Sequence, residues 1–354
     1  MHHHESGFVH PDFRLNGFRL SAEELRKLAY DLIKEGEPHE KPVGDFLLDW
    51  FDDRDYVAIR TSGTTGTPKL VRIKKEHMVN SAMATADFFN EHSHTKALLC
   101  LPAQYVAGKM MLVRAMINGW KLDMAPPVSN PLEGNDKVYD FAAMVPLQAE
   151  HSFEKLGQVK KLILGGGRVS PSLAAKLQTL STEIWETYAM TETVTHIAAK
   201  RIGEVAFTTL PGVSVSTDAR GCLVIHAPNV ADTTVVTNDL ATVQDAEHFI
   251  WQGRVDNVIN SGGIKLYPEQ IEEKLSSFIS QRFFVHGIQD DILGERLVLV
   301  VEGEPYIISS DAYIALDKYE KPKEVLFVAQ FAETGTGKIQ RSETVKILFT
   351  EERA

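Results

Sequence analysis

The sequence has little of what marks several large classes of protein. Its 354 residues include two cysteines, Cys100 and Cys222, which lie far apart and in no Cys-x-x-Cys pattern. They indicate neither a disulfide framework nor a metal site, so we expect a cytoplasmic location. No apolar run approaches the roughly 20 residues of a membrane span, and no signal-peptide core is apparent. Positive charge is in deficit, with 37 Lys and Arg against 48 Asp and Glu, which excludes bulk attraction to nucleic acid or an anionic membrane.

What remains is the composition of an ordinary globular protein, 44% hydrophobic and 24% charged. This length predicts two domains. Strands that alternate with amphipathic helices after Val57 predict a layered α/β domain with a largely buried sheet. A β-rich stretch over 203–251 predicts a small antiparallel subdomain, and a smaller α+β unit follows. We therefore expect an N-terminal domain at 1–255 and a smaller C-terminal domain at 256–354. His2, His3 and His4 are set aside from this reasoning.

Local patterns predict individual elements. Ser21, followed by Glu23 and Glu24, is typical of a helix N-cap, and Ser170-Pro171 is typical of another. Helical spacing of apolar residues predicts a helix with Met78, Ala82, Ala86 and Phe89 on one face, and further helices over 110–120 and 269–279. Strands are expected over 57–59, 70–73, 98–101 and 162–164, and near Phe283 and Leu297.

The strongest motif is Thr61-Ser62-Gly63-Thr64-Thr65-Gly66-Thr67-Pro68-Lys69. Glycines and small hydroxyls let backbone N–H groups approach phosphate oxygens, and Lys69 supplies a point charge. Because Leu70 follows Lys69 and the spacing differs, the segment is not a Walker A loop. A plain Ser/Thr/Gly hairpin loop is the alternative.

Further segments follow in order along the chain. Each alone is compatible with a turn or a helix cap. They are Gly165-Gly166-Gly167, Tyr188-Ala189-Met190-Thr191-Glu192-Thr193, Thr237-Asn238-Asp239, the run from Gly253 to Glu272, and Thr334-Gly335-Thr336-Gly337-Lys338-Ile339-Gln340-Arg341.

Together these segments resemble the AMP-forming adenylating enzymes, a family of acyl-CoA synthetases, luciferases and peptide-synthetase adenylation domains. The resemblance covers about Val57 to Arg341. It implies an enzyme that uses ATP, Mg²⁺ and coenzyme A. Family members usually carry a longer segment before the phosphate loop, so we expect a shortened first lobe.

The resemblance implies a role for each matched residue. ATP would be bound by Thr61, Ser62, Gly63, Thr64, Thr65, Gly66 and Lys69, with Gly165, Gly166, Gly167 and Tyr188 at the adenine, Thr191 at a phosphate, and Asp239 and Arg254 at the ribose. Glu192 would bind Mg²⁺, as suits a hard carboxylate oxygen. Lys338, with Lys69, Thr191 and Glu192, would be catalytic. Ala189 and Asn238 each stand where the family usually has glycine.

The segment after Gly253 resembles the family's hinge and thiol channel. By that resemblance Asp256 is the hinge, Gly262 and Gly263 line the channel for coenzyme A, and Lys265 lies close to it. A mobile lysine flanked by glycine, such as Lys338, can stabilise charge during attack on the α-phosphate.

The finer pattern resembles the 2-succinylbenzoate–CoA ligase branch, which serves menaquinone biosynthesis. The supporting runs are 101–102, 105–108, 164–171, 190–198 and 249–259, although Tyr105-Val106-Ala107-Gly108 stands where that branch has His-Val-Ser-Gly. Expected substrate residues are Tyr105, Gly108, Arg114 and His196. Arg114 lies among apolar residues and, if buried, needs an anion, either a substrate carboxylate or a protein carboxylate.

Three functions stay open from the sequence. They are an aryl-acid CoA ligase, an adenylating enzyme that loads a carrier-protein thiol, and a non-catalytic nucleotide-binding relative. The presence of Lys69, Glu192, Asp239, Arg254 and Lys338 argues against the third. The expected partners are an aromatic dicarboxylic acid, ATP, coenzyme A and, as an option, a second copy of the chain.

Overall fold

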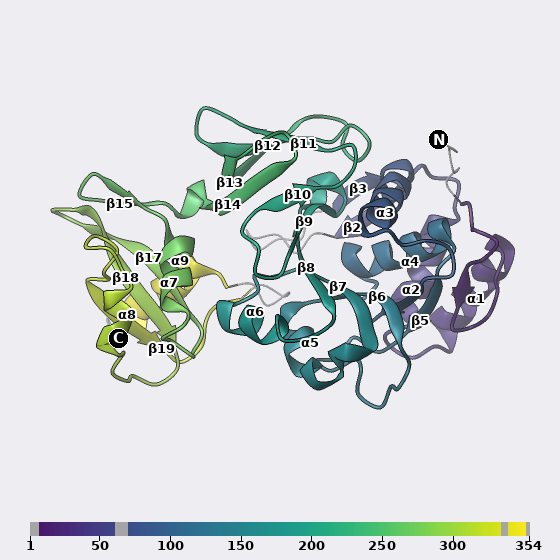
Figure 1. Ribbon diagram of the computed structural model, residues 1–354, viewed down its shortest axis with the longest axis horizontal. Helices are drawn as coiled ribbons and strands as arrows, with labels where there is room; N and C mark the ends of the chain where they lie inside the picture. The colour runs from purple at the N-terminus through teal and green to yellow at the C-terminus, as the bar shows by residue number, and fades with distance from the viewer. Residues whose placement is uncertain (1–6, 61–69, 334–338, 352–354) are drawn as a thin grey trace.

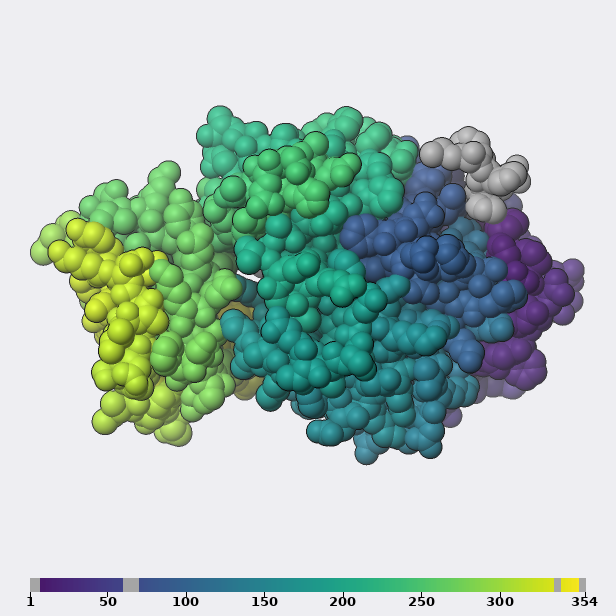
Figure 2. All heavy atoms as spheres, in the orientation of Figure 1, coloured from purple at the N-terminus to yellow at the C-terminus, as the bar shows by residue number. Residues whose placement is uncertain are grey.

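The computed structural model describes residues 7–60, 70–333 and 339–351. Within these ranges the strands form a 12-stranded sheet, a 5-stranded sheet and a two-stranded hairpin. Figure 1 shows the large sheet with its helices on one side of the molecule and the smaller sheet on the other. In the space-filling view of Figure 2 the two units meet along a narrow seam.

The large sheet begins with parallel strands that alternate with helices. Its parallel part runs in the order β1-β5-β4-β6-β7-β8. These strands are β1 (Arg14–Leu15), β4 (Lys96–Leu99), β5 (Lys121–Met124), β6 (Tyr139–Met144), β7 (Val159–Leu164) and β8 (Glu183–Ala189). The helices are α1 (Ala22–Lys34), α2 (Lys41–Trp50), α3 (Lys75–Phe89), α4 (Val106–Asn118), α5 (Pro146–His151) and α6 (Pro171–Leu177), with the 3-10 turn η1 (Phe153–Gln158). The hairpin joins β2 (Tyr56–Arg60) to β3 (Leu70–Lys74). The expected layered α/β domain is confirmed.

Helices cover both faces of this sheet because the buried strand residues alternate in direction. Phe141 and Ala143 share a core with α1 to α4, whereas Ala142 and Met144 share a second core with α5 and α6. Both cysteines are buried and free.

The same sheet continues as antiparallel strands. They follow β8 in the order β9-β10-β14-β13-β12-β11. Their bounds are β9 (His196–Arg201), β10 (Phe207–Thr209), β11 (Ser214–Thr217), β12 (Cys222–His226), β13 (Val235–Val243) and β14 (His248–Arg254), with η2 (Thr191–Thr193) before β9. The expected antiparallel region is therefore present. It does not form a sheet of its own. Because β9 pairs with β8, the antiparallel strands continue the large sheet.

The smaller unit follows the 3-10 turn η3 (Val255–Asn257). It contains β15 (Ile259–Ser261), β16 (Ile264–Leu266), α7 (Pro268–Leu275), β17 (Phe283–Asp290), β18 (Gly294–Glu302), α8 (Ser310–Ile314), β19 (Glu324–Val328) and α9 (Arg341–Glu351). Its sheet has α7 and α8 on one face and α9 on the other, since Val285 and Leu299 pack with the former and Phe284 and Val300 with the latter.

Most local expectations are confirmed, and several boundaries were wrong. Ser21 forms a full capping box with Glu24, and Ser170 accepts a hydrogen bond from the backbone N–H of Leu173. The helix expected at 110–120 begins at Val106 and ends at Asn118, where Gly119 takes a left-handed conformation that stops it. The strand expected over 98–101 is β4 (Lys96–Leu99), and α7 ends at Leu275 rather than Ile279.

Candidate active site

A cavity of about 600 Å³ opens at the carboxyl ends of the parallel strands. Its walls include Ala143, Met144 and Ile163 from β6 and β7, Ala189 from β8, and Leu101 from the loop after β4. Open α/β sheets bind ligands at this edge. The topology therefore brings segments from across the large unit to one site.

Two of the three predicted glycines line this cavity. Gly165 and Gly166 follow β7, whereas exposed Gly167 is not among the lining residues. A Cβ atom on Gly165 would lie 2.9 Å from the hydroxyl of Thr187, and Gly166 has a φ of +79°. The loop therefore lies closer to β8 than a side chain at Gly165 permits.

The end of β8 and the residues that follow it also line the cavity. A β-bulge separates Tyr188 from Ala189, and bulges re-aim strand residues beside sites. Ala189 and Thr191 line the cavity, whereas Glu192 is exposed on η2. The predicted phosphate residue Thr191 thus lies at the cavity, with the predicted Mg²⁺ ligand beside it in the chain.

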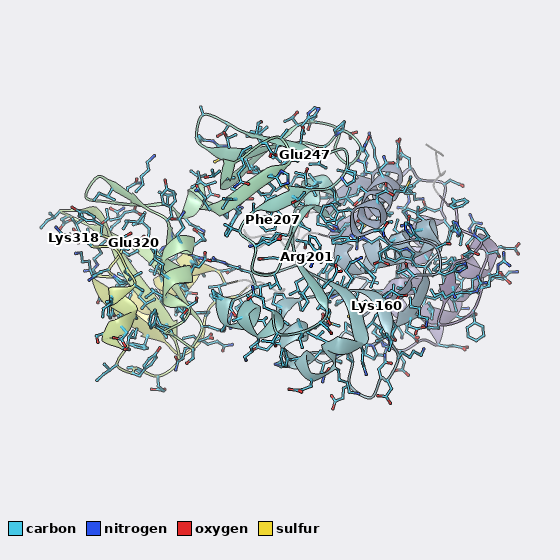
Figure 3. All side chains as sticks on the ribbon, viewed as in Figure 1. Lys160, Arg201, Phe207, Glu247, Lys318 and Glu320 are labelled. Carbon is cyan, nitrogen blue, oxygen red and sulfur yellow. The ribbon has the colours of Figure 1, made fainter. Side chains whose placement is uncertain are left out.

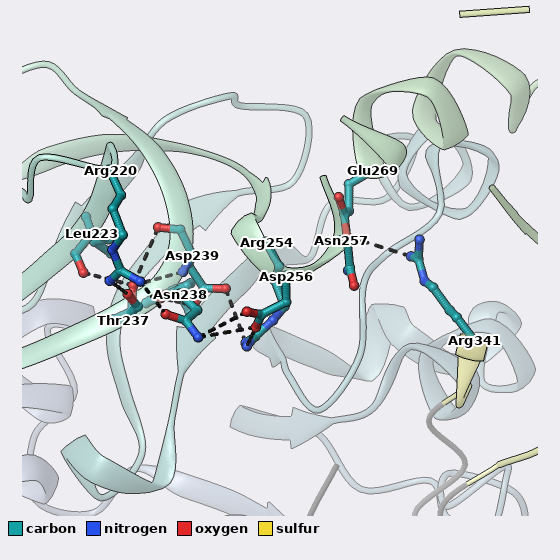
Figure 4. A network of polar contacts seen from close by, with 11 residues as sticks. Arg220, Leu223, Thr237, Asn238, Asp239, Arg254, Asp256, Asn257, Glu269 and Arg341 are labelled. Atoms are coloured by element: carbon teal, nitrogen blue, oxygen red, sulfur yellow. Dashed lines mark hydrogen bonds and ion pairs between the residues drawn. The ribbon is translucent and has the colours of Figure 1, made fainter. Parts of the chain in front are cut away.

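Tyr188, Asp239 and Arg254 form one polar cluster. The Tyr188 hydroxyl donates to Oδ2 of the buried Asp239 across 2.6 Å. Burial and this neighbouring carboxylate raise the pKa of Tyr188. Asp239 pairs with Arg254 across β13 and β14, and their side chains approach to 3.6 Å (Figure 4). Tyr188, one of the predicted adenine residues, is therefore brought together with the two predicted ribose residues, although none of the three is among the residues that line the cavity.

Arg114 is buried at the cavity, with 2% of its surface exposed. Its Nε donates to the hydroxyl of Thr85 at 3.3 Å, and its Nη2 lies 3.5 Å from the hydroxyl of Thr195. No carboxylate among the described residues forms an ion pair with Arg114. The expected alternative, a salt bridge to a protein carboxylate, is therefore excluded within these residues. Burial lowers the pKa of Arg114 to about 9, so the guanidinium stays protonated at neutral pH.

His196 holds one edge of Arg114. Burial, and then the Arg114 charge, keep the pKa of His196 well below its usual range, so the ring is neutral. Nδ1 therefore accepts from Nη2 of Arg114 at 3.3 Å, and the ring proton lies on Nε2, 3.5 Å from the hydroxyl of Thr85. Thr85 donates its own proton to the carbonyl of Ser81, which leaves its oxygen free to accept.

The other two predicted substrate residues differ in position. Tyr105 lines the cavity, directly before α4. Gly108 does not line it and belongs to the first turn of α4. A Cβ there would lie 2.4 Å from the carbonyl oxygen of Pro102, so Gly108 permits close packing.

Sequence reasoning missed Thr85 and Thr195, two of the residues that contact Arg114. Thr85 lies on the buried face of α3 among Ala82, Ala86 and Phe89. A polar residue on an otherwise apolar helical face was a usable signal, because a buried hydroxyl needs a partner.

The expected channel residues lie elsewhere. Gly262 and Gly263, with φ of +59° and +81°, form the turn between β15 and β16, and Lys265 is exposed on β16. Figure 1 shows this hairpin at the outer edge of the smaller unit, away from the large sheet. Asp256 lies in η3 and accepts hydrogen bonds from Asn238 and Arg254.

Several predicted residues lie outside the described ranges. These are Thr61, Ser62, Gly63, Thr64, Thr65, Gly66, Lys69 and Lys338. Among the described residues, no group of three or more His, Cys, Asp or Glu is arranged to hold a metal ion. In the same ranges, no helix has the length and apolar character to cross a membrane.

Comparison with known families gives a match over residues 29–220, to the model described as AMP-binding enzyme. The chain belongs to this family. It is 33% identical to an acyl-CoA synthetase (AMP-forming)/AMP-acid ligase II-like protein from Dyadobacter fermentans, with a TM-score of 0.61, over 91% of this chain and 98% of that one.

Curated relatives are more distant in sequence. A 2-succinylbenzoate–CoA ligase of Enterococcus faecalis is 24% identical over 83% of this chain and 69% of its own length. One from Staphylococcus aureus is 25% identical over 95% and 75%. The o-succinylbenzoate coenzyme A synthetase of Bacillus subtilis, solved with ATP and magnesium, shares the fold with a TM-score of 0.73 at 18% identity over 93% of this chain and 83% of that one.

Proposed function

We propose that this chain is an AMP-forming acid–CoA ligase that acts on 2-succinylbenzoate. The substrate carboxylate attacks the α-phosphate of ATP and releases diphosphate. The thiol of coenzyme A then attacks the acyl carbonyl, loses its proton to solvent and displaces AMP. Membership of the AMP-binding family supports the reaction class, and the curated relatives support the acid.

The nucleotide half of the site rests on the cluster of Tyr188, Asp239 and Arg254. An aromatic face suits a base, and a carboxylate suits the vicinal hydroxyls of a ribose. Asp239 is 9% exposed and already oriented by Tyr188, so it needs little rearrangement to accept both hydroxyls. Gly165 and Gly166 provide a close backbone edge at the cavity, which the cluster itself does not line.

The acid half rests on Arg114, and this observation carries the proposal. A buried cation with neutral partners retains a large desolvation cost unless a ligand supplies an anion. 2-Succinylbenzoate has two carboxylates, so one can react while the other pairs with Arg114. One cavity contains both Arg114 and Thr191, the residue expected at a phosphate, since both line it.

The remaining assignments come from the family resemblance. Glu192 would hold Mg²⁺ together with nucleotide phosphates, and its exposed carboxylate is a ligand type that Mg²⁺ prefers. Mg²⁺ supplies charge neutralisation at the phosphates when bound. Lys69 would contact the phosphates and Lys338 would stabilise charge during adenylation.

A rotation of residues 256–354 about Asp256 completes the proposal. It would bring Gly262, Gly263 and Lys265 toward the cavity for the thiol step, since one cavity serves both steps. The domain division at 1–255 and 256–354, the cytoplasmic location and a homodimer are further parts of the proposal.

The deciding experiment measures diphosphate release from ATP with 2-succinylbenzoate, with and without coenzyme A. Acid-dependent release together with a thioester product formed only with coenzyme A supports the proposal. Adenylate formation without transfer to coenzyme A favours a carrier-protein loader. ATP binding without release under both conditions favours a non-catalytic relative.

A further inference from the structure

Arg168 connects the two units of the molecule. It directly follows Gly165–Gly167, the loop at the cavity edge. Its Nη1 donates to the backbone oxygen of Glu269 at 2.9 Å, and its Nη2 donates to the carboxylate of Glu273 at 2.8 Å. Both acceptors lie on α7 of the smaller unit. The guanidinium also lies over the Trp251 ring of β14, 5.9 Å from its centroid.

A second contact fixes the same end of α7. The side-chain amide of Asn257 donates to Oε1 of Glu269 at 2.6 Å, and Glu269 is 6% exposed (Figure 4). Its other oxygen faces Gly253, where a Cβ would lie 2.6 Å from it. Gly253 also has a φ of +134°, a conformation that favours glycine, and β14 lies close to α7 at this position.

We propose that Arg168 is a positioning residue that holds the smaller unit, residues 259–351, in the orientation described here. Among the described residues, Arg168–Glu273 is the one ion pair that joins the large sheet to this unit. Both side chains are exposed, so the ion pair alone contributes little. The charge-assisted bond to a backbone oxygen and the contact with Trp251 add to it.

The position of Arg168 gives this contact a role in catalysis, which rests on the function proposed above. In this orientation the Gly262–Gly263 hairpin lies away from the large sheet (Figure 1). The contact therefore stabilises an arrangement in which that hairpin does not reach the cavity. Loss of Arg168 should slow adenylation and spare thioester formation from supplied acyl-adenylate.

A matched control exists within the large sheet. Arg201 on β9, labelled in Figure 3, lies over Trp185 at 5.1 Å and forms an ion pair with Glu183 at 3.1 Å. It has the same combination of ring and carboxylate as Arg168, but both partners belong to one sheet. Arg201→Ala should thus lower stability about as much as Arg168→Ala without changing the orientation of the units.

The first test measures the distance between the units. Glu247→Cys and Lys318→Cys place spin labels on exposed sites in the large and small units, both labelled in Figure 3. The substrate-free protein should give one main distance, which shifts or broadens in Arg168→Ala and Glu273→Gln but not in Arg201→Ala. Identical distributions in all four proteins overturn the proposal.

The second test measures both half-reactions. Arg168→Ala should slow ATP–diphosphate exchange about fivefold to tenfold, as expected for one partly exposed charged contact, with no loss of thioester formation. Equal loss in both steps overturns the catalytic role. If the parent protein shows no exchange, the proposed function fails, and the distance measurement, which uses no substrate, still decides the role of Arg168.

Discussion

The hydroxyl of Tyr188 donates a hydrogen bond to Asp239 across 2.6 Å, although the two residues are 51 positions apart. The bond joins the end of β8 to β13, and it orients a buried carboxylate beside Arg254. Tyr188 and Asp239, which the family resemblance assigns to the same nucleotide, are thus hydrogen-bonded to each other.

Tyr188→Phe should raise the KM for ATP about fivefold to thirtyfold while kcat changes less. The variant keeps the aromatic face but removes one hydrogen bond to a buried carboxylate, a loss of about 1–2 kcal/mol. Tyr139→Phe is the control, because the Tyr139 hydroxyl also donates to an aspartate, Asp123, to which the family resemblance gives no role at the nucleotide. Equal KM changes in the two variants would contradict the assignment of Tyr188.

Arg114→Ala should reduce kcat/KM for 2-succinylbenzoate by roughly 30-fold to several thousand-fold. Loss of one partner of a desolvated charge pair costs about 2–5 kcal/mol. The measurement compares both proteins with the diacid and with an analogue whose non-reacting carboxylate is a neutral amide. The penalty should shrink with the amide. An equal penalty for both acids would make Arg114 a structural residue.

Lys338→Ala should slow adenylation by about 100-fold or more, the scale for removing one preorganised charge. Thioester formation from supplied acyl-adenylate should persist, because the resemblance assigns that step to the Gly262–Gly263 side of the smaller unit. Rapid-quench measurement of each half-reaction tests this. Parallel losses in both steps would count against Lys338 as the adenylation lysine.

Acidification should destabilise the protein through His196. Its folded-state pKa is depressed by burial and by Arg114, so below about pH 6.5 the unfolded chain binds a proton that the folded chain excludes. The free energy of unfolding should therefore fall as the pH drops from 6.5 toward 5. His196→Gln should reduce that slope by up to about 1.4 kcal/mol per pH unit in denaturant titrations. An unchanged slope would argue that His196 is already protonated.

The sequence by itself determined the local structure and the family. Alternating strands and helices have distinct apolar periods, so the layered α/β class followed from pattern alone. The Ser21 and Ser170 caps depend on neighbours within three residues, which a sequence displays directly. The ordered motifs from Thr61 to Arg341 pointed to the AMP-binding family, which the match over residues 29–220 confirmed.

Only the tertiary structure decided which of these residues meet. Arg114 and His196 are 82 positions apart, and Arg168 and Glu273 are 105 apart. Such contacts depend on strand order and register. Many weak interactions along the whole chain together determine these two features. The absence of a protein carboxylate beside Arg114 among the described residues follows from that packing. Local periodicity carries no information about it, because it depends on what other elements place against α4.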